Sequence, residues 1–184
     1  MQNNSENSSL LNAQNLMYAA MCIALGFATS NIKLVDMPMG GSVTPFSMFF
    51  ICFAGYLFGP VTGLVTSFAY GLLQLIVDPY ILSPLQVVCD YFLAFGALGL
   101  CGFFRKMPHG LHIGYFVSIT GRFFFSVISG VVFFAEYAPE GMNPVVYSAL
   151  YNGAYIYAEG LLTMALMAVP AVRQAIREVR QATA

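Results

Sequence analysis

Residues 46–77 read FSMFFICFAGYLFGPVTGLVTSFAYGLLQLIV, an apolar segment without a charged side chain. The segment is too long for one membrane-spanning helix, which needs about 20 apolar residues. Gly59-Pro60 interrupts it near the middle. Because proline lacks the N–H that a helix interior requires, this pair ends one helix and starts the next. The segment therefore predicts a tight hairpin of two membrane helices.

The rest of the chain has a similar composition. Of its 184 residues, 59% are hydrophobic and 8% are charged, whereas about 25% are charged in an ordinary soluble domain. This composition excludes a soluble enzyme. The net charge of -1, with scattered basic residues, also excludes a nucleic-acid-binding protein, which needs a basic surface for phosphate. An integral membrane protein is predicted.

Four further apolar segments bring the predicted number of spanning helices to six, and they cover residues 13–30, 84–104, 111–134 and 144–169. Three helices share a start signal, in which a capping residue precedes proline at the first helical position. These signals are Thr44-Pro45, Ser83-Pro84 and Asn143-Pro144. The predicted fold class is therefore an all-α integral membrane protein with six transmembrane helices.

The basic residues predict the orientation in the membrane. Five of them fall on one face of a six-span chain, namely Arg105, Lys106, Arg173, Arg177 and Arg180. By the positive-inside rule this face and both termini are cytoplasmic. The predicted outer loops carry a net negative charge, which attracts cations.

The predicted organisation is a single membrane domain flanked by two tails. The membrane domain covers residues 13–172. Residues 1–12 contain no Lys or Arg, so they lack the positive region of a secretory signal, and a disordered cytoplasmic tail is predicted. Residues 173–184 are expected to be a basic cytoplasmic tail.

Three charged residues are predicted at membrane depth: Asp90, Arg122 and Glu159. Charges in a bilayer are costly and mark a function or a buried pair. Arg122 and Glu159 lie at nearly the same predicted depth, so a structural ion pair between two helices is expected. Asp90 has no such partner in the sequence. It is either a binding group for a cationic ligand or a solvated structural carboxylate.

Polar residues follow three predicted helices at helical spacing, which predicts that they point into the bundle. The three rows are Ser67, Tyr70, Gln74 and Asp78; Arg122, Ser126 and Ser129; and Ser148, Asn152, Tyr155 and Glu159. Asp90, Asn152, Tyr147 and Phe134 together predict a small aromatic pocket with one anion and one amide. Such a pocket suits a flat, cationic, nitrogen-rich heterocycle.

Familiar catalytic and metal-binding signatures are absent from the sequence. It contains no P-loop, no H-E-x-x-H and no G-x-S-x-G, so no catalytic residue and no metal ligand is predicted. The chain is not expected to be an enzyme, and energy for transport must come from a partner or an ion gradient. Ala20 and Ala24 form a small-xxx-small pattern that serves either partner docking or internal packing. The segment MPMGGSVT, residues 37–44, is either a lid or an ordinary loop.

Three segments resemble the thiamine-specific substrate-binding subunits, or S-components, of energy-coupling factor (ECF) vitamin transporters. They are residues 37–44, residues 78–106, DPYILSPLQVVCDYFLAFGALGLCGFFRK, and residues 121–155, GRFFFSVISGVVFFAEYAPEGMNPVVYSALYNGAY. The resemblance implies a six-helix S-component bundle in the prokaryotic plasma membrane that captures thiamine from outside. It also implies docking through Ala20 and Ala24 onto a transmembrane coupling protein with two cytoplasmic ATPases.

The resemblance also implies ligand-binding residues. Asp90 stands where the family places an acidic residue near the thiazolium of thiamine, and Asn152, Tyr147 and Tyr80 match pocket positions. Two positions depart from the family pattern, with Ser126 in place of histidine and Phe134 in place of tryptophan. Phe134 can still stack on a cation, although tryptophan does so more strongly. These departures leave open the affinity and the exact ligand.

Three alternatives remain open from the sequence. The chain is an S-component for another vitamin or a thiamine precursor, a small intramembrane enzyme, or a solitary ion-coupled carrier. The enzyme alternative lacks an activated nucleophile or a metal cluster in the sequence. Transport by this chain alone would favour the carrier.

Overall fold

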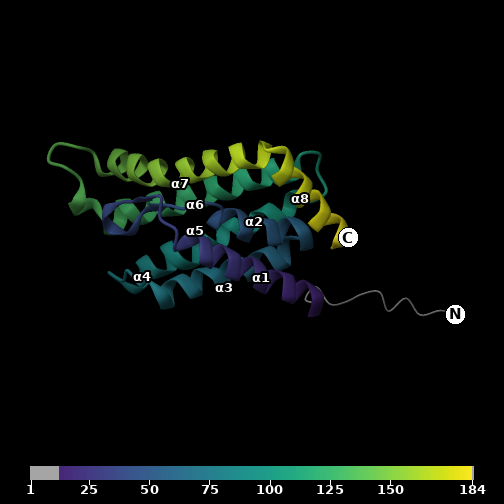
Figure 1. Ribbon diagram of the computed structural model, residues 1–184. Helices are drawn as coiled ribbons and strands as arrows, with labels where there is room; N and C mark the ends of the chain where they lie inside the picture. Colours follow the sequence, from purple (N-terminus) through teal and green to yellow (C-terminus); the bar gives the residue numbers. More distant parts are fainter. Residues whose placement is uncertain (1–12, 184) are drawn as a thin grey trace.

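The computed structural model describes residues 13–183, which are mostly helical (Figure 1). The tail predicted for residues 1–12 lies outside the described part of the chain. The long helices run beside one another along a common direction. The start of the first helix and the whole of the last helix lie at one end, and the connection between α6 and α7 lies at the other.

The bundle is made of long helices and one composite helical segment. The long helices are α1 (Ala13–Ser30), α2 (Ser47–Phe58), α3 (Pro60–Val77), α6 (Gly110–Phe133) and α7 (Pro144–Ala168). The composite segment is made of α4 (Pro84–Val87), the π-helical turn η2 (Val88–Leu93), α5 (Ala94–Gly96) and the 3-10 helix η3 (Ala97–Phe104).

The shorter elements lie in the connections and at the end of the chain. They are β1 (Val35–Asp36), η1 (Pro38–Gly40), β2 (Ser42–Val43), η4 (Ala135–Tyr137) and α8 (Pro170–Ala182). Strands β1 and β2 pair antiparallel. Helix α8 occupies most of the segment 173–184, for which the sequence predicted a basic tail.

The predicted helix boundaries agree closely with the structure. Gly59 separates α2 from α3 with a φ of 99°, a conformation that glycine tolerates. Two predicted caps are formed, since the Ser83 hydroxyl accepts from the Gln86 N–H and the Asn143 side chain accepts from the Val145 N–H. The third cap is different, because α2 begins only at Ser47 and the Thr44 hydroxyl donates to Glu159 instead.

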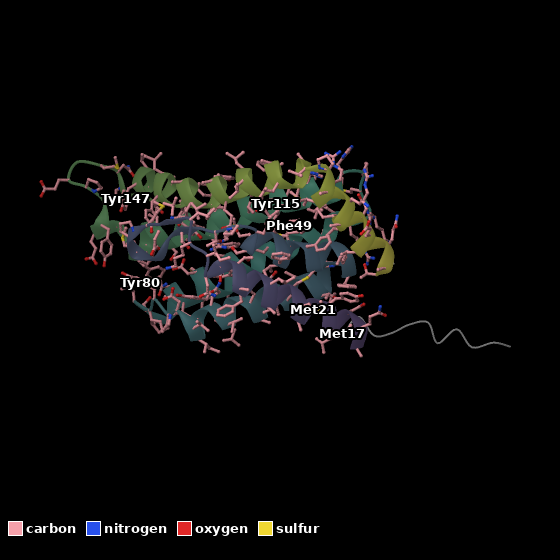
Figure 2. All side chains as sticks on the ribbon, viewed as in Figure 1. Met17, Met21, Phe49, Tyr80, Tyr115 and Tyr147 are labelled. Carbon is pink, nitrogen blue, oxygen red and sulfur yellow. The ribbon has the colours of Figure 1, made fainter. Side chains whose placement is uncertain are left out.

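Helix α2 lies at the centre of the bundle. Ten of its 12 residues are buried, as expected of a helix that is apolar on all sides. Phe49 stacks on Phe53, and Tyr115 of α6 meets Phe49 edge-on in the same core (Figure 2). Helix α2 is therefore surrounded by protein rather than by lipid, so it does not need the length of a lipid-exposed spanning helix.

The outer helix faces carry many exposed apolar side chains, among them Phe68, Phe116 and Phe124. Apolar surfaces of this extent mark contact with lipid or partners. Helix α3, the composite segment Pro84–Phe104 and α6 are each long and apolar enough to cross a membrane. Helices α7 and α8 meet the same criteria only together, with a bend of 85° between them. The count of six spans and the cytoplasmic position of both termini remain predictions.

The structure corrects the predicted ion pair between Arg122 and Glu159. Glu159 is buried, and its Oε1 accepts from the Ser47 hydroxyl (2.8 Å) and the Met48 N–H (3.0 Å). Its Oε2 accepts from the Thr44 hydroxyl at 2.8 Å. The first N–H groups of a helix have no partner within the helix and attract negative charge. The start of α2, not Arg122, therefore satisfies this carboxylate.

Arg122 lies in a different environment. Its guanidinium carbon is 4.3 Å from the centre of the Phe95 ring, a cation-π contact. Within residues 13–183 the one salt bridge joins Lys33 to Asp36. The ion pair was predicted from the equal depth of Arg122 and Glu159 along their helices. That prediction did not consider the N–H groups at the start of α2, which also seek an acceptor.

Three glycines allow close backbone packing between α2, α3 and η3. A Cβ added at Gly63 would lie 2.7 Å from the Gly55 Cα and 2.9 Å from the Gly99 carbonyl oxygen. Both neighbours are backbone atoms, which cannot make room for the added Cβ by a change of side-chain rotamer. In contrast, the nearest heavy atom to a Cβ at Gly153 is a Phe123 ring carbon at 3.5 Å.

Gly63→Ala is expected to destabilise the protein in detergent by about 2 kcal/mol, or roughly 4–8 °C in Tm, because overpacking forces backbone to move. Gly153→Ala is the matched control. This substitution is expected to leave Tm unchanged or to raise it, since alanine favours a helix. Equal melting temperatures for the two variants would contradict the close packing.

Glu159→Gln is expected to lower the free energy of unfolding by about 1–3 kcal/mol, because a buried charge-assisted network is lost. A double-mutant cycle with Ser47→Ala should show coupling above about 0.5 kcal/mol. The coupling with Arg122→Met should be smaller. The exposed Glu178→Gln serves as the control. Stronger coupling of Glu159 to Arg122 than to Ser47 would support the ion pair instead of the network at the start of α2.

Candidate ligand-binding site

The structure contains a cavity of about 280 Å³ between the 37–44 segment, α3, the composite segment, α6 and α7. Tyr80 and Tyr147, which line it, lie toward the end of the bundle opposite α8 (Figure 2). Every side chain that the sequence predicted for ligand binding lines this one cavity. They are Tyr80, Asp90, Ser126, Phe134, Tyr147 and Asn152.

Asp90 projects from the π-helical turn η2 into this cavity. Its Oδ2 accepts a hydrogen bond of 2.7 Å from the Gln86 side chain, which is 1% exposed. The Gln86 oxygen in turn accepts from the Leu82 N–H at 3.1 Å. Gln86 therefore orients the carboxylate and ties it to the preceding loop. A π-helical turn is common at functional sites, because it redirects side chains.

Aromatic rings form one side of the cavity. Tyr80 and Phe134 stack with ring centres 5.7 Å apart and an interplanar angle of 25°. The Tyr91 hydroxyl holds the loop that carries Tyr80, since it accepts from the Tyr80 N–H (2.8 Å) and donates to the Asp78 carbonyl (3.2 Å). The ring faces are electron-rich and suit a flat cation.

Asn152 of α7 is fixed by its neighbours. Its amide nitrogen donates to the carbonyls of Ser148 (3.0 Å) and Ser126 (3.3 Å). Its amide oxygen accepts from the Tyr155 hydroxyl at 2.9 Å. An amide oxygen has two lone pairs, so this one can accept a second hydrogen bond. Asn152 therefore presents an oriented acceptor.

The loop between α1 and α2 closes over part of the cavity. Met39, Gly40 and Gly41 line it. The Tyr151 hydroxyl accepts from the Gly41 N–H at 3.0 Å and donates to the Pro38 carbonyl. The segment thus packs on α7 through Tyr151 and, at its end, through the hydrogen bond from Thr44 to Glu159. Whether it opens and closes as a lid remains a prediction.

Other cavity residues came to light only in the structure. Ser30, at the end of α1, accepts from the Gln74 side chain at 3.2 Å, and Gln74 also donates to the Tyr70 hydroxyl at 2.6 Å. Lys33 lines the cavity as well. The polar rows predicted Tyr70 and Gln74, but neither spacing nor residue type marked Ser30 or Lys33. Among residues 13–183 no three His, Cys, Asp or Glu side chains are grouped to hold a metal ion.

The electrostatics of the cavity favour a cation near Asp90. Glu159 also lines the cavity, but its oxygens are engaged by the start of α2. Arg122 also lines the cavity, and its guanidinium lies over the Phe95 ring. Among the described residues Asp90 accepts one hydrogen bond, from a neutral amide, and forms no salt bridge, so a cationic ligand can pair with it. The arrangement is therefore suited to binding a cationic ligand rather than to covalent chemistry.

Ala20 and Ala24, the predicted docking residues, lie away from the cavity on the exposed face of α1. Leu16, Met17 and Met21 beside them are also exposed, by 51–55%. Figure 2 shows Met17 and Met21 along the outer side of α1. The same helix packs inward through Ala19, Cys22 and Gly26. Both alanines are therefore exposed in the chain by itself, and their role in docking remains a prediction.

Comparison with known proteins gives the family. The family model described as "Thiamine transporter protein" matches residues 16–177. The thiamine transporter ThiT of Bacillus subtilis is 32% identical over 136 residues, which cover 66% of this chain and 70% of that protein. The thiamine transporter ThiT of Lacticaseibacillus paracasei is 31% identical over 128 residues, or 60% and 64% of the two chains.

A solved structure of ThiT from Listeria monocytogenes has the same fold. Its TM-score is 0.71 at 22% identity, and the match covers 87% of this chain and 97% of that chain. The predicted helical membrane fold is thereby confirmed. Because the family match spans most of the described helices and all of the cavity residues, the chain belongs to the thiamine transporter protein family.

Proposed function

We propose that this chain is the substrate-binding subunit of an ATP-driven vitamin importer and that its cavity holds thiamine. The observation that carries the assignment is Asp90, a carboxylate that faces an aromatic cavity and has no salt-bridge partner among residues 13–183. Thiamine has a permanently charged thiazolium ring and an aminopyrimidine ring. The name of the family supports this ligand.

The two rings of thiamine match the two sides of the cavity. The thiazolium lies near Asp90, where opposite charge and the stacked pair Tyr80 and Phe134 stabilise a flat cation. The aminopyrimidine lies near Asn152, whose free lone pair accepts from its amino group. Tyr147 adds a further aromatic ring to the cavity wall. Ser126 can hydrogen-bond to the ligand through its hydroxyl but has no ring to stack on it.

Energy for uptake comes from a partner assembly in this proposal. The chain contains no ATP-binding loop, so it docks onto a transmembrane ECF coupling protein that carries two cytoplasmic ATPases. The docking surface is the exposed face of α1 around Ala20 and Ala24. Small residues there let a partner helix approach closely, and the flanking Leu16, Met17 and Met21 supply apolar area.

Asp90→Asn is expected to weaken thiamine binding at least about tenfold, or ~1.4 kcal/mol, because it removes the charge that faces the thiazolium. Isothermal titration calorimetry on the purified protein measures the change. Glu140→Gln is the matched control, since Glu140 is exposed and lies outside the cavity. It should stay within about twofold of the wild type. Unchanged affinity in Asp90→Asn would refute the proposed ligand position.

Ala20→Leu combined with Ala24→Leu is expected to abolish ATP-driven thiamine uptake while thiamine affinity stays unchanged, because larger side chains keep the partner helix away. Uptake into vesicles that contain the full complex measures the first effect, and titration measures the second. Ala158→Leu, at an exposed position of α7, is the matched control. Full uptake by the double variant would remove α1 as the docking surface.

A further inference from the structure

Helix α8 leaves the bundle at a sharp angle. Pro170 starts it immediately after α7 ends at Ala168, and the two helix axes differ by 85°. Helix α7 packs along α6, which is long and apolar enough to cross a membrane. A helix nearly perpendicular to a spanning helix lies close to the plane of the membrane surface. Figure 1 shows α8 turning across the end of the bundle.

Helix α8 has two different faces. Val172 and Ile176, one turn apart, are partly buried, and Ile176 packs against the hydrophobic core. Arg173, Arg177 and Arg180 follow at the same helical spacing and are exposed. The apolar face is thus covered by the bundle itself, and Arg173 and Arg177 are exposed beside it.

The arginines of α8 join a second basic segment. The Arg180 side chain donates to the Arg105 carbonyl at 3.3 Å and lies over the Tyr56 ring. We define the basic surface as Arg105, Lys106, Arg173, Arg177 and Arg180, five of the seven Lys and Arg residues of the chain. Nitrogen atoms gather at this end of the molecule in Figure 2.

Acidic side chains do not neutralise the basic surface within the described residues. Glu178 is the acidic residue of α8, and its carboxylate accepts from Gln174 at 2.8 Å instead of from an arginine. The one salt bridge among residues 13–183 joins Lys33 to Asp36 in the connection between α1 and α2. In the part of the chain that the structure describes, the basic surface therefore has no acidic side chain in a salt bridge with it.

We propose that the basic surface binds the phosphate headgroups of anionic phospholipids at the membrane face beside α8. The guanidinium fork fits phosphate geometry and binds it bidentately. Basic residues beside spanning helices are attracted to the anionic lipids of the cytoplasmic leaflet. This surface would hold the end of the bundle at that leaflet, independently of the ligand in the cavity.

Neighbouring apolar residues favour lipid over an acidic soluble protein as the occupant. Phe103 and Met107, on either side of Arg105 and Lys106, are 60% and 47% exposed. Val169, just before α8, is 41% exposed. Cations that alternate with exposed apolar side chains are typical of the boundary between headgroups and acyl chains.

The test is native mass spectrometry of the full-length protein in detergent, mixed with equal amounts of phosphatidylglycerol and phosphatidylcholine that carry the same acyl chains. The wild type is expected to retain phosphatidylglycerol preferentially. The double variant Arg173→Gln/Arg177→Gln should lower this preference by roughly fivefold per arginine, since each contributes about 1 kcal/mol near an anionic surface. Added salt should weaken the preference.

Matched variants separate position and charge from folding. Arg173→Lys/Arg177→Lys keeps the charge and should keep most of the preference. Lys33→Gln, compared with Arg177→Gln, removes one cation from the other end of the molecule and should have no effect. Tm verifies that each variant is folded, and thiamine titration adds a second check for the arginine variants, whose substituted residues lie outside the cavity.

Two results would overturn the proposal. The first is equal retention of both lipids by the wild type, or an unchanged preference in the Arg173→Gln/Arg177→Gln variant. The second is an Arg173→Gln/Arg177→Gln variant that keeps its lipid preference but no longer co-purifies with an ATPase. This result would assign the basic surface to a protein partner. Neither result depends on whether thiamine is the ligand of the cavity.

Discussion

The architecture depends on one buried carboxylate. Glu159 lies in a long apolar helix, where an unsatisfied charge is very costly. The hydroxyls of Thr44 and Ser47 and the first N–H groups of α2 surround its oxygens. This network fixes where the central helix begins, and the 37–44 segment that precedes it is thereby held beside α7. One wall of the cavity is formed by that segment.

The position of α2 explains the division between core and cavity. From Ser47 onward α2 fills the centre of the bundle with apolar side chains. Between the start of α2 and the end of the bundle opposite α8, the polar rows of α3, α6 and α7 have no central helix to pack against. Lipid cannot solvate these groups, so they turn inward and line the cavity. Tyr70, Ser126 and Asn152 are all buried there.

The two ends of the molecule have opposite chemistry. The end with the cavity presents Asp90 and aromatic rings to an incoming ligand. The end with α8 carries most of the basic residues on one surface. Such a separation of charge orients a membrane protein. In the proposed function, the first end captures a cation, and the second faces the compartment of the ATPases.

The sequence by itself determined the class of fold, most helix boundaries and six members of the cavity. Lipid exposure imposes long apolar runs, and proline and glycine end helices at defined points. Polar residues in such runs must point inward, so Asp90 and Asn152 were assigned to one pocket. Only the tertiary structure decided the partner of Glu159 and the helical form of residues 170–182. The partner of Glu159 and the helix at residues 170–182 both depend on contacts between segments that are distant in the sequence. The depth of a residue along one helix does not specify such contacts.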